Sequence, residues 1–115
     1  MSRTPTPHLA DPVSSRPVAD ARRMMAASQA AVAAACVAYA DARRSQETGL
    51  LDPTASNRLG RAKPGEFVPD ELSVVLCQQP FHVRRLLART RRVQTGLPTV
   101  WAAHTAGDLD AAQVE

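Results

Sequence analysis

The first strong pattern in the chain is an alanine-rich stretch without glycine or proline. It runs from Asp20 to about Glu47, and alanine has the highest helix propensity of the amino acids. Asp20 is a suitable cap for its start. The larger apolar residues recur seven, four and three positions apart, which places them on one helix face: Met25, Val32, Cys36 and Tyr39. The pattern therefore predicts one long Ala-rich helix over residues 20–47.

Helical spacing returns after Pro69. Asp70 is a good N-cap at that point, and a second helix of this region is expected from about Phe81 to Thr95, where Gly96 ends it. The apolar positions from here onward are expected to form a small core: Leu72, Val75, Leu76, Val83, Leu86, Leu87, Val93, Leu97, Val100 and Trp101.

Two shorter helices are predicted after this hairpin. One begins near Leu97-Pro98 and ends at Gly107, and the next starts at Asp110, which has the spacing of a capping box with Gln113. The last helical pattern stops after a few residues. We therefore expect that the chain is truncated at its C-terminal end.

The remaining segments are rich in residues that interrupt helices. Residues 1–19 hold several prolines among Ser, Thr and Arg and are predicted to be a disordered arm. Residues 48–69 mix Gly and Pro with polar residues and are predicted to be a flexible connector. The expected fold is all-α: the arm, the long helix over 20–47, the connector, and a small helical domain over 70–115 that opens with a helix-turn-helix-like hairpin.

The helix predicted over residues 81–95 has two different faces. At 100° per residue, its apolar side and Thr90 fall on one half: Val83, Leu86, Leu87, Thr90 and Val93. Five arginines and no acidic residue fall on the other half: Arg84, Arg85, Arg89, Arg91 and Arg92. Such a face favours an anionic partner. The candidate contacts to nucleic-acid phosphates are Arg84, Arg85, Arg89 and Arg92. A solvated charged face on an ordinary helical hairpin is the alternative.

Residues 70–93 have the length of a helix-turn-helix, whose second helix enters the major groove of DNA. The turn contains no glycine, and the second helix begins with Phe81, His82 and arginines. That helix has no Asn, and no Gln before Gln94, to pair with adenine. Binding of DNA is therefore expected to rest on the phosphate backbone, with little sequence preference and a steep dependence on salt.

Composition and charge refine this picture only slightly. The chain of 115 residues has a formal net charge of +3, and Lys63 is its only lysine. Arginine suits bidentate phosphate contacts, but a GC-rich genome would produce the same excess of Arg and Ala, so both explanations stay open. No run of 18 apolar residues and no secretory signal is present, so we expect a cytoplasmic protein without a membrane partner.

The residue types that carry catalysis form no group in the sequence. His8, His82 and His104 have no carboxylate cluster near them, and there is no GxSxG elbow and no phosphate-binding glycine loop. Cys36 and Cys77 lie far apart within apolar helical patterns, without the CxxC spacing of a zinc site. We therefore predict two buried free thiols and no catalytic residue, metal or cofactor.

The order of these patterns resembles a known family. The elements that carry the resemblance are the Ala-rich helix with its Tyr39–Arg44 end, the E-L-x-x-x-L opening at Glu71, Leu72 and Leu76, the Arg/Leu helix, the Leu97-Pro98 step and the Gly107-x-Leu109-Asp110 turn. Over about residues 20–115 this order is similar to the actinobacterial domain of unknown function 222, called the 13E12 repeat family in mycobacteria.

The resemblance implies a DNA-related context. Members of that family commonly carry this helical region ahead of an HNH endonuclease domain, which needs His and Asn clustered around a metal. Asn57 is the only asparagine here, and no histidine is near it. The expected function is a non-catalytic accessory module that contacts DNA phosphates. The alternatives are a protein-interaction or oligomerisation module, whose long helix pairs with itself or with a missing C-terminal region, and a truncated, non-functional gene remnant.

Overall fold

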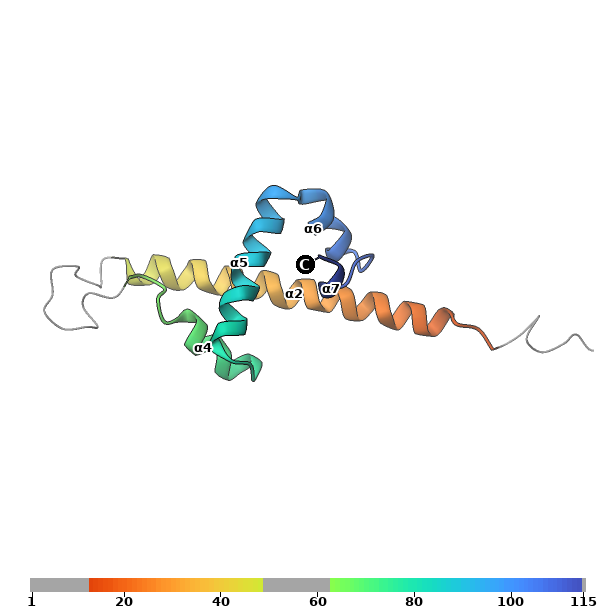
Figure 1. Cartoon of the computed structure of the whole chain (residues 1–115), viewed down its shortest axis with the longest axis horizontal. Coiled ribbons are helices and arrows are strands. Elements are labelled where there is room, and N and C mark those ends of the chain that lie inside the picture. Colours follow the sequence, from red (N-terminus) through yellow and green to blue (C-terminus); the bar gives the residue numbers. More distant parts are fainter. Residues whose placement is uncertain (1–12, 49–62, 115) are drawn as a thin grey trace, which may run out of the picture.

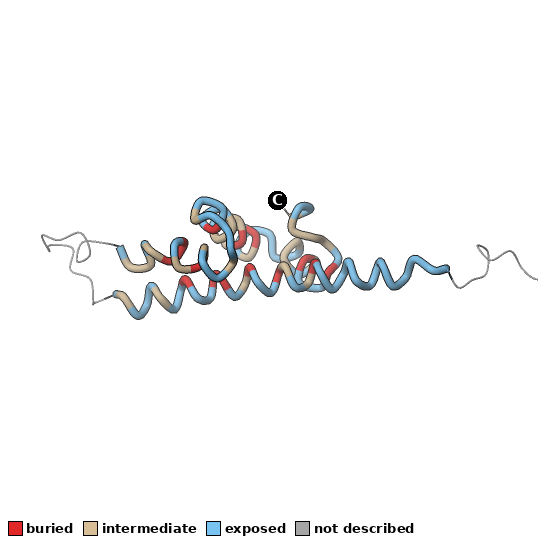
Figure 2. The backbone as a smooth tube through the Cα atoms, turned by 90° about the horizontal axis from the view of Figure 1, so that it is seen from below, coloured by how far each residue is buried: buried red, intermediate tan, exposed pale blue. Residues whose placement is uncertain are grey.

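The computed structural model describes residues 13–48 and 63–114, and within them every regular element is a helix (Figure 1). The helices are α2 (Arg16–Glu47), α4 (Val68–Leu76), α5 (Pro80–Gly96), α6 (Pro98–Thr105) and α7 (Ala111–Val114). The all-α prediction is therefore confirmed. The long helix α2 forms a straight base, and the shorter helices pack along one side of it (Figure 2).

The helix α2 begins at Arg16, four residues before the expected start at Asp20. Pro17 lies in its first turn, where the missing N–H would have had no partner inside the helix. Two backbone N–H groups of this turn donate to the Ser15 carbonyl at 3.0 and 3.1 Å. The last residues of the predicted arm are thus helical, whereas the part of the arm in residues 1–12 lies outside the described residues.

The helix α4 also begins earlier than expected, at Val68 instead of Asp70. Pro69 therefore lies inside the first turn, where proline is favourable, and not before the helix. Val68 is only 2% exposed, so the end of the predicted connector contributes to the core. Most of that connector, residues 49–62, lies outside the described part of the chain.

Alanine forms most of the α2 face that packs against the other helices. The buried residues of α2 are Ala26, Ala30, Ala33, Cys36, Val37 and Ala40. Of the larger side chains that the spacing placed on one face, Cys36 is buried, whereas Met25, Val32 and Tyr39 are 61%, 46% and 38% exposed. Small side chains allow helix axes to approach closely, and the shorter helices lie against this alanine-rich face of α2.

The core is shared between α2 and the later helices. Its buried cluster consists of Cys36, Ala40, Val68, Leu72 and Val83, with Leu76, Leu86 and Leu87 packed against it. The prediction of a core within residues 70–115 therefore missed the contribution of α2. Val93 is buried as expected, and Val100 and Trp101 are half-buried. Val75 and Leu97 are wrong as core residues, since α2 covers only the neighbouring side of α4 and Leu97 lies between two helices.

Ion pairs fasten α2 to the later elements at both of its DARR sequences, residues 20–23 and 41–44. These pairs are Arg22–Asp110 at 3.1 Å, Arg23–Asp108 at 2.8 Å, Arg43–Glu71 at 3.0 Å and Asp41–Arg91 at 2.9 Å. Each side chain remains partly exposed, so one such pair contributes about 0–1 kcal/mol to stability. Their joint effect is to fix the register of α2 against the rest of the chain.

A three-residue turn, Cys77–Gln79, joins α4 to α5. Cys77 adopts the left-handed conformation, with φ of 55° and ψ of 42°. The Gln78 N–H then donates to the Ser73 carbonyl at 3.1 Å and closes the end of α4. Because of this conformation Cys77 lies at the surface, so the prediction of a buried thiol is wrong there and right for Cys36. Both thiols are free.

The loop between α6 and α7 lies directly against α2. Gly107 has a φ of +87°, and a Cβ at this position would collide with the backbone carbonyl of Arg23. Asp110 and Gln113 form the predicted capping box through two reciprocal hydrogen bonds of 2.9 Å. The Ala111 N–H donates to Gln29 Oε1 of α2 at 2.9 Å. The C-terminal turns are therefore anchored on α2.

Candidate nucleic-acid interface

The arginines of α5 do not form one continuous face. The exposed residues at the centre of its outer side are Phe81, Arg84, Arg85, Ala88, Arg92 and Thr95. We call Arg84, Arg85 and Arg92 the arginine face. Arg92 follows Arg84 by eight residues, which is about 12 Å along the helix at 1.5 Å per residue. Three of the four candidate phosphate contacts thus share one exposed side of α5.

The other two arginines of α5 lie on its flanks. Arg91 faces α2, where its Nη1 atom lies 2.9 Å from Asp41 Oδ1. The sequence pattern could not show this pair, because Asp41 is distant along the chain and only the fold brings it near. Arg89, the fourth candidate contact, is half-buried beside α2. It therefore faces a different direction from the arginine face.

The side chains of the arginine face differ in their surroundings. The guanidinium of Arg85 lies 5.8 Å from the centre of the Phe81 ring, which itself is 53% exposed. This cation–π contact holds the charge near the start of α5. Within the described residues, neither Arg84 nor Arg92 has an ion-pair partner. Both charges are directed to solvent and can reach an anion.

Polar groups surround the start of α5. The first turn has no acidic residue, and the partial positive charge of a helix N-terminus adds to the arginines near it. Gln78, Gln79 and His82 are exposed at this end. The two glutamines precede the helix, in the turn from α4. Their amides can donate and accept hydrogen bonds beside the arginine face.

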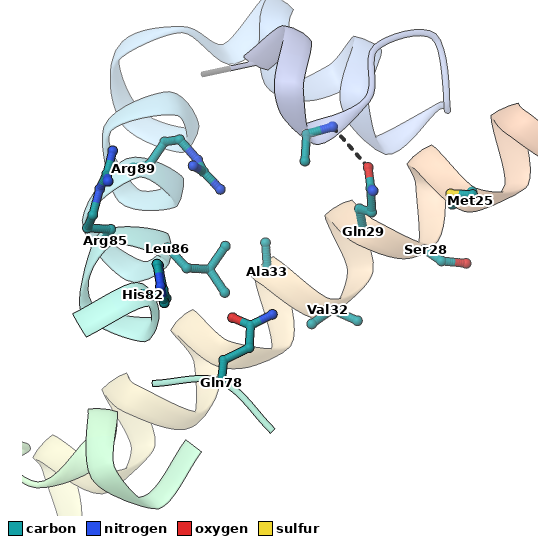
Figure 3. A pocket seen from close by; sticks show the side chains of 11 residues that line it. Met25, Ser28, Gln29, Val32, Ala33, Gln78, His82, Arg85, Leu86 and Arg89 are labelled. Carbon is teal, nitrogen blue, oxygen red and sulfur yellow. Dashed lines mark hydrogen bonds between the residues drawn. The ribbon is translucent and has the colours of Figure 1, made fainter. Parts of the chain in front are cut away.

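A hollow of about 680 Å³ separates the flank of α5 from the first half of α2 (Figure 3). His82, Arg85 and Arg89 line it from α5, and Met25 and Gln29 line it from α2. The wall on the α5 side is therefore basic, whereas the α2 side is uncharged. Ser28 of α2 also lines the hollow.

The one buried histidine of the described residues has a structural role. His104 is 3% exposed, and its Nδ1 donates to the Leu109 carbonyl at 2.6 Å. Its ring also lies 5.7 Å from that of Trp101. Within residues 13–48 and 63–114, no three His, Cys, Asp or Glu residues lie close enough to hold a metal ion.

Tyr39 and Arg43 of α2 meet Glu71 of α4. The Tyr39 hydroxyl donates to Glu71 Oε1 at 3.2 Å, and Arg43 binds both carboxylate oxygens. Partial burial and the hydrogen bond to Glu71 raise the pKa of the Tyr39 hydroxyl above 10.0. The same hydrogen bond raises the pKa of Arg43. This cluster fixes α4 on α2 and is a packing contact between two of the sequence motifs.

The helix α2 is long and apolar enough to cross a membrane, judged by its length and composition. A third of its most apolar stretch is buried inside the fold. Arg22, Arg23 and Arg43 form ion pairs with later parts of the chain near the two ends of that stretch. These contacts belong to the packing of α2 in the helical fold.

In comparisons with known proteins, no family model matches this chain, and no curated protein or solved structure matches it.

Proposed function

We propose that this chain is a non-catalytic helical module that contacts the phosphate backbone of DNA through Arg84, Arg85 and Arg92. The observation that carries the proposal is that α5 has no acidic residue and directs three arginines to solvent on one side. Arginine forms paired hydrogen bonds with phosphate oxygens, and binding releases the counterions condensed on DNA.

The α4–α5 hairpin supports this proposal by its shape. It has a nine-residue helix, a three-residue turn and a 17-residue helix, which are the proportions of a helix-turn-helix. The exposed side of α5 offers arginine and Phe81 and no side chain with the paired donor and acceptor that reads adenine. The proposed contact therefore positions the protein on DNA and selects little among sequences.

The resemblance to the 13E12 repeat family supplies the biological setting of the proposal. Two motifs that carry the resemblance, the Tyr39–Arg44 end and the opening at Glu71, touch each other in the structure. In the proposed setting, the module would hold a nuclease-type protein near DNA while a different domain performs the chemistry.

The test is a fluorescence-anisotropy titration of labelled duplex DNA at low and moderate salt. The test variant combines Arg84→Gln, Arg85→Gln and Arg92→Gln. The control variant combines Arg16→Gln, Arg44→Gln and Lys63→Gln, three exposed basic residues away from α5. Both variants lose three positive charges, so a difference between them reports the position of the charges and not the net charge.

The test variant should lose most of its affinity for DNA. The affinity falls as salt rises, and removing three phosphate contacts should make this dependence shallower. The slope of log affinity against log salt should become less negative by about 2.7, at about 0.9 per contact. The control variant should bind with nearly the original slope. Equal losses in the two variants would contradict a localised interface, and no binding by the original chain in low salt would refute the function itself.

A further inference from the structure

An exposed side of α2, which borders the hollow against α5 and the groove against α4, carries a regular repeat. Large apolar residues recur every seven positions and are all exposed: Val18, Met25, Val32 and Tyr39. Three positions after each one is a small residue, also exposed: Ala21, Ser28, Ala35 and Ala42. We call these eight residues the α2 seam. The spacing of seven, with a second position at three, is the heptad pattern of paired helices.

The α2 seam contains no charge, although it lies on the outside of the molecule. One flank of the seam is uncharged as well, with Met24, Ala31, Ala38 and Ser45, whereas the other flank holds Arg22, Gln29, Cys36 and Arg43. An ordinary solvent-facing side of a helix alternates charged and polar residues. The charged residues of α2 instead lie near its two ends, mostly at positions that pair with the later helices. An uncharged side almost 40 Å long at 1.5 Å per residue is suited to a contact.

The seam also borders an apolar groove between α2 and α4. Val32 and Tyr39 form one wall, and Leu72, Val75 and Leu76 form the other. Val75 is 75% exposed although it is apolar and lies next to the core. The groove has a volume of about 390 Å³, and Glu71 lies at its lining as well. A helix lying on the seam would cover both walls.

The α2 seam is complementary to itself when two copies run in opposite directions. In an antiparallel helix pair, the first heptad position of one helix lies across from the fourth position of the other. Here the first position is always large and the fourth always small, so every layer joins a large residue to a small one. The layers are Val18 with Ala42, Met25 with Ala35, Val32 with Ser28 and Tyr39 with Ala21 of the second copy.

A parallel pair would pack less well. Large residues would then meet large residues and small ones would meet small ones, which leaves voids at the alanine layers. The antiparallel order fills each layer evenly and allows the close approach that small residues permit. The pattern of side-chain size therefore distinguishes the two orientations.

The area available is close to what a specific contact needs. A strip about 40 Å long and 10 Å wide, the width of a helix, offers about 400 Å² from each copy. The wall formed by Val75 and Leu76 of α4 adds to each side. The total approaches the roughly 1,000 Å² buried by specific interfaces.

From these observations we infer that the α2 seam is the interface of an antiparallel homodimer, with the second copy's α2 lying along the groove between α2 and α4. The arginine face of α5 is on a different element and takes no part in this contact. The inference thus stands independently of the proposed contact with DNA.

Sedimentation velocity of the full chain over a wide range of concentrations tests the inference. The chain should pass from monomer to dimer as its concentration rises. Ala35→Glu places a charge in the seam at an exposed position and should weaken association at least about tenfold, because the carboxylate would be buried in the dimer. Ala19→Glu adds the same charge to α2 away from the seam and should leave association unchanged.

A charge-pair experiment tests the orientation. Met25→Lys combined with Ala35→Glu in one chain should restore dimerisation, since the two altered positions face each other only when the copies are antiparallel. In a parallel pair, each altered residue would meet its own copy and the repulsion would remain. Circular dichroism with thermal melting shows that each variant still folds as a monomer.

Three results would overturn the inference. The chain could stay monomeric at the highest concentration reached. Ala19→Glu could weaken association as much as Ala35→Glu does. The monomeric chain could instead bind neutral phosphatidylcholine vesicles through a mode that Ala35→Glu abolishes, which would assign the seam to a lipid surface. Failure to restore dimers with the charge pair would overturn the antiparallel arrangement.

Discussion

Arg43 and Glu71 are joined by two hydrogen bonds, with Nη2 lying 3.0 Å from Oε2 and Nε 3.4 Å from Oε1. Arg43 lies near the end of the long helix and Glu71 lies in the first turn of α4, so this pair sets where the hairpin lies on α2. About a third of each side chain remains exposed. The pair therefore contributes more to the position of α4 than to the overall stability.

Glu71→Gln should lower the free energy of unfolding by about 0.5–1 kcal/mol, because Arg43 loses its charged partner while the shape of the side chain is kept. Urea denaturation monitored by circular dichroism measures this change. Asp70→Asn is the matched control, since Asp70 lies in the same first turn of α4 but does not contact Arg43. If both variants lost the same free energy of unfolding, the effect would come from removing a negative charge near the N-terminus of α4 and not from the contact with Arg43.

Tyr39 is the only tyrosine of the chain, so its titration can be followed by phenolate absorbance. Because partial burial and the bond to Glu71 raise its pKa in the folded state, the midpoint should lie above 10.0. In urea the midpoint should return to the ordinary value. Glu71→Gln should lower the midpoint of the folded chain, because the carboxylate that accepts the hydroxyl proton is gone.

The sign of the linked stability follows from that shift. The folded state holds the Tyr39 proton more tightly than the unfolded state does. The corresponding stabilisation is complete below pH 10.0 and is lost as the pH rises through the folded pKa. Tyr39→Phe should therefore reduce the loss of stability at alkaline pH. An unchanged alkaline dependence in this variant would show that other groups cause it.

Gly107→Ala should destabilise the fold by at least about 2 kcal/mol, since it combines a left-handed backbone with a collision against the Arg23 carbonyl. Gly96→Ala is the control, because an added Cβ there meets nothing within 4 Å. That change should stabilise the chain by up to about 1 kcal/mol through helix propensity. Thermal melting of both variants would reveal the opposite signs, and a neutral Gly107→Ala would contradict the close packing of this loop on α2.

The two thiols should react at very different rates with a thiol-specific reagent. Cys77 is exposed, whereas burial raises the pKa of the Cys36 thiol above 9.0 and shields it from the reagent. One equivalent should react rapidly and the second only when the chain unfolds. Cys77→Ser should remove the fast phase and Cys36→Ala the slow one. Two fast phases in the native chain would contradict the packing of α2 on the later helices.

Local patterns were enough to predict most of the helices. The Ala-rich stretch, the break before Pro80 and the capping box at Asp110 each act over a few residues, so the sequence shows them directly. The early starts of α2 and α4 were missed for one shared reason. Pro17 and Pro69 were interpreted as residues that precede a helix, although a first turn accepts proline equally well.

Tertiary relationships were harder to predict. Both sides of α2 have helical spacing, and the packed side is the one with smaller residues because the contact depends on close approach of the helices. The pairing of Arg91 with Asp41 likewise depends on the crossing of α5 over α2. The exposure of Arg84, Arg85 and Arg92 could be predicted from the 3.6-residue period, since exposure on a helix follows from spacing once one side is buried.

The attachment of residues 107–113 to the first half of α2 bears on how the chain is made. Arg22 and Arg23 pair with Asp110 and Asp108, and Gln29 accepts a bond from Ala111, across more than 80 positions. During synthesis α2 must therefore leave the ribosome long before these partners exist. Its high alanine content favours the helical conformation until these partners have been synthesised. Folding of this chain is thus expected to conclude only after translation of its last turns.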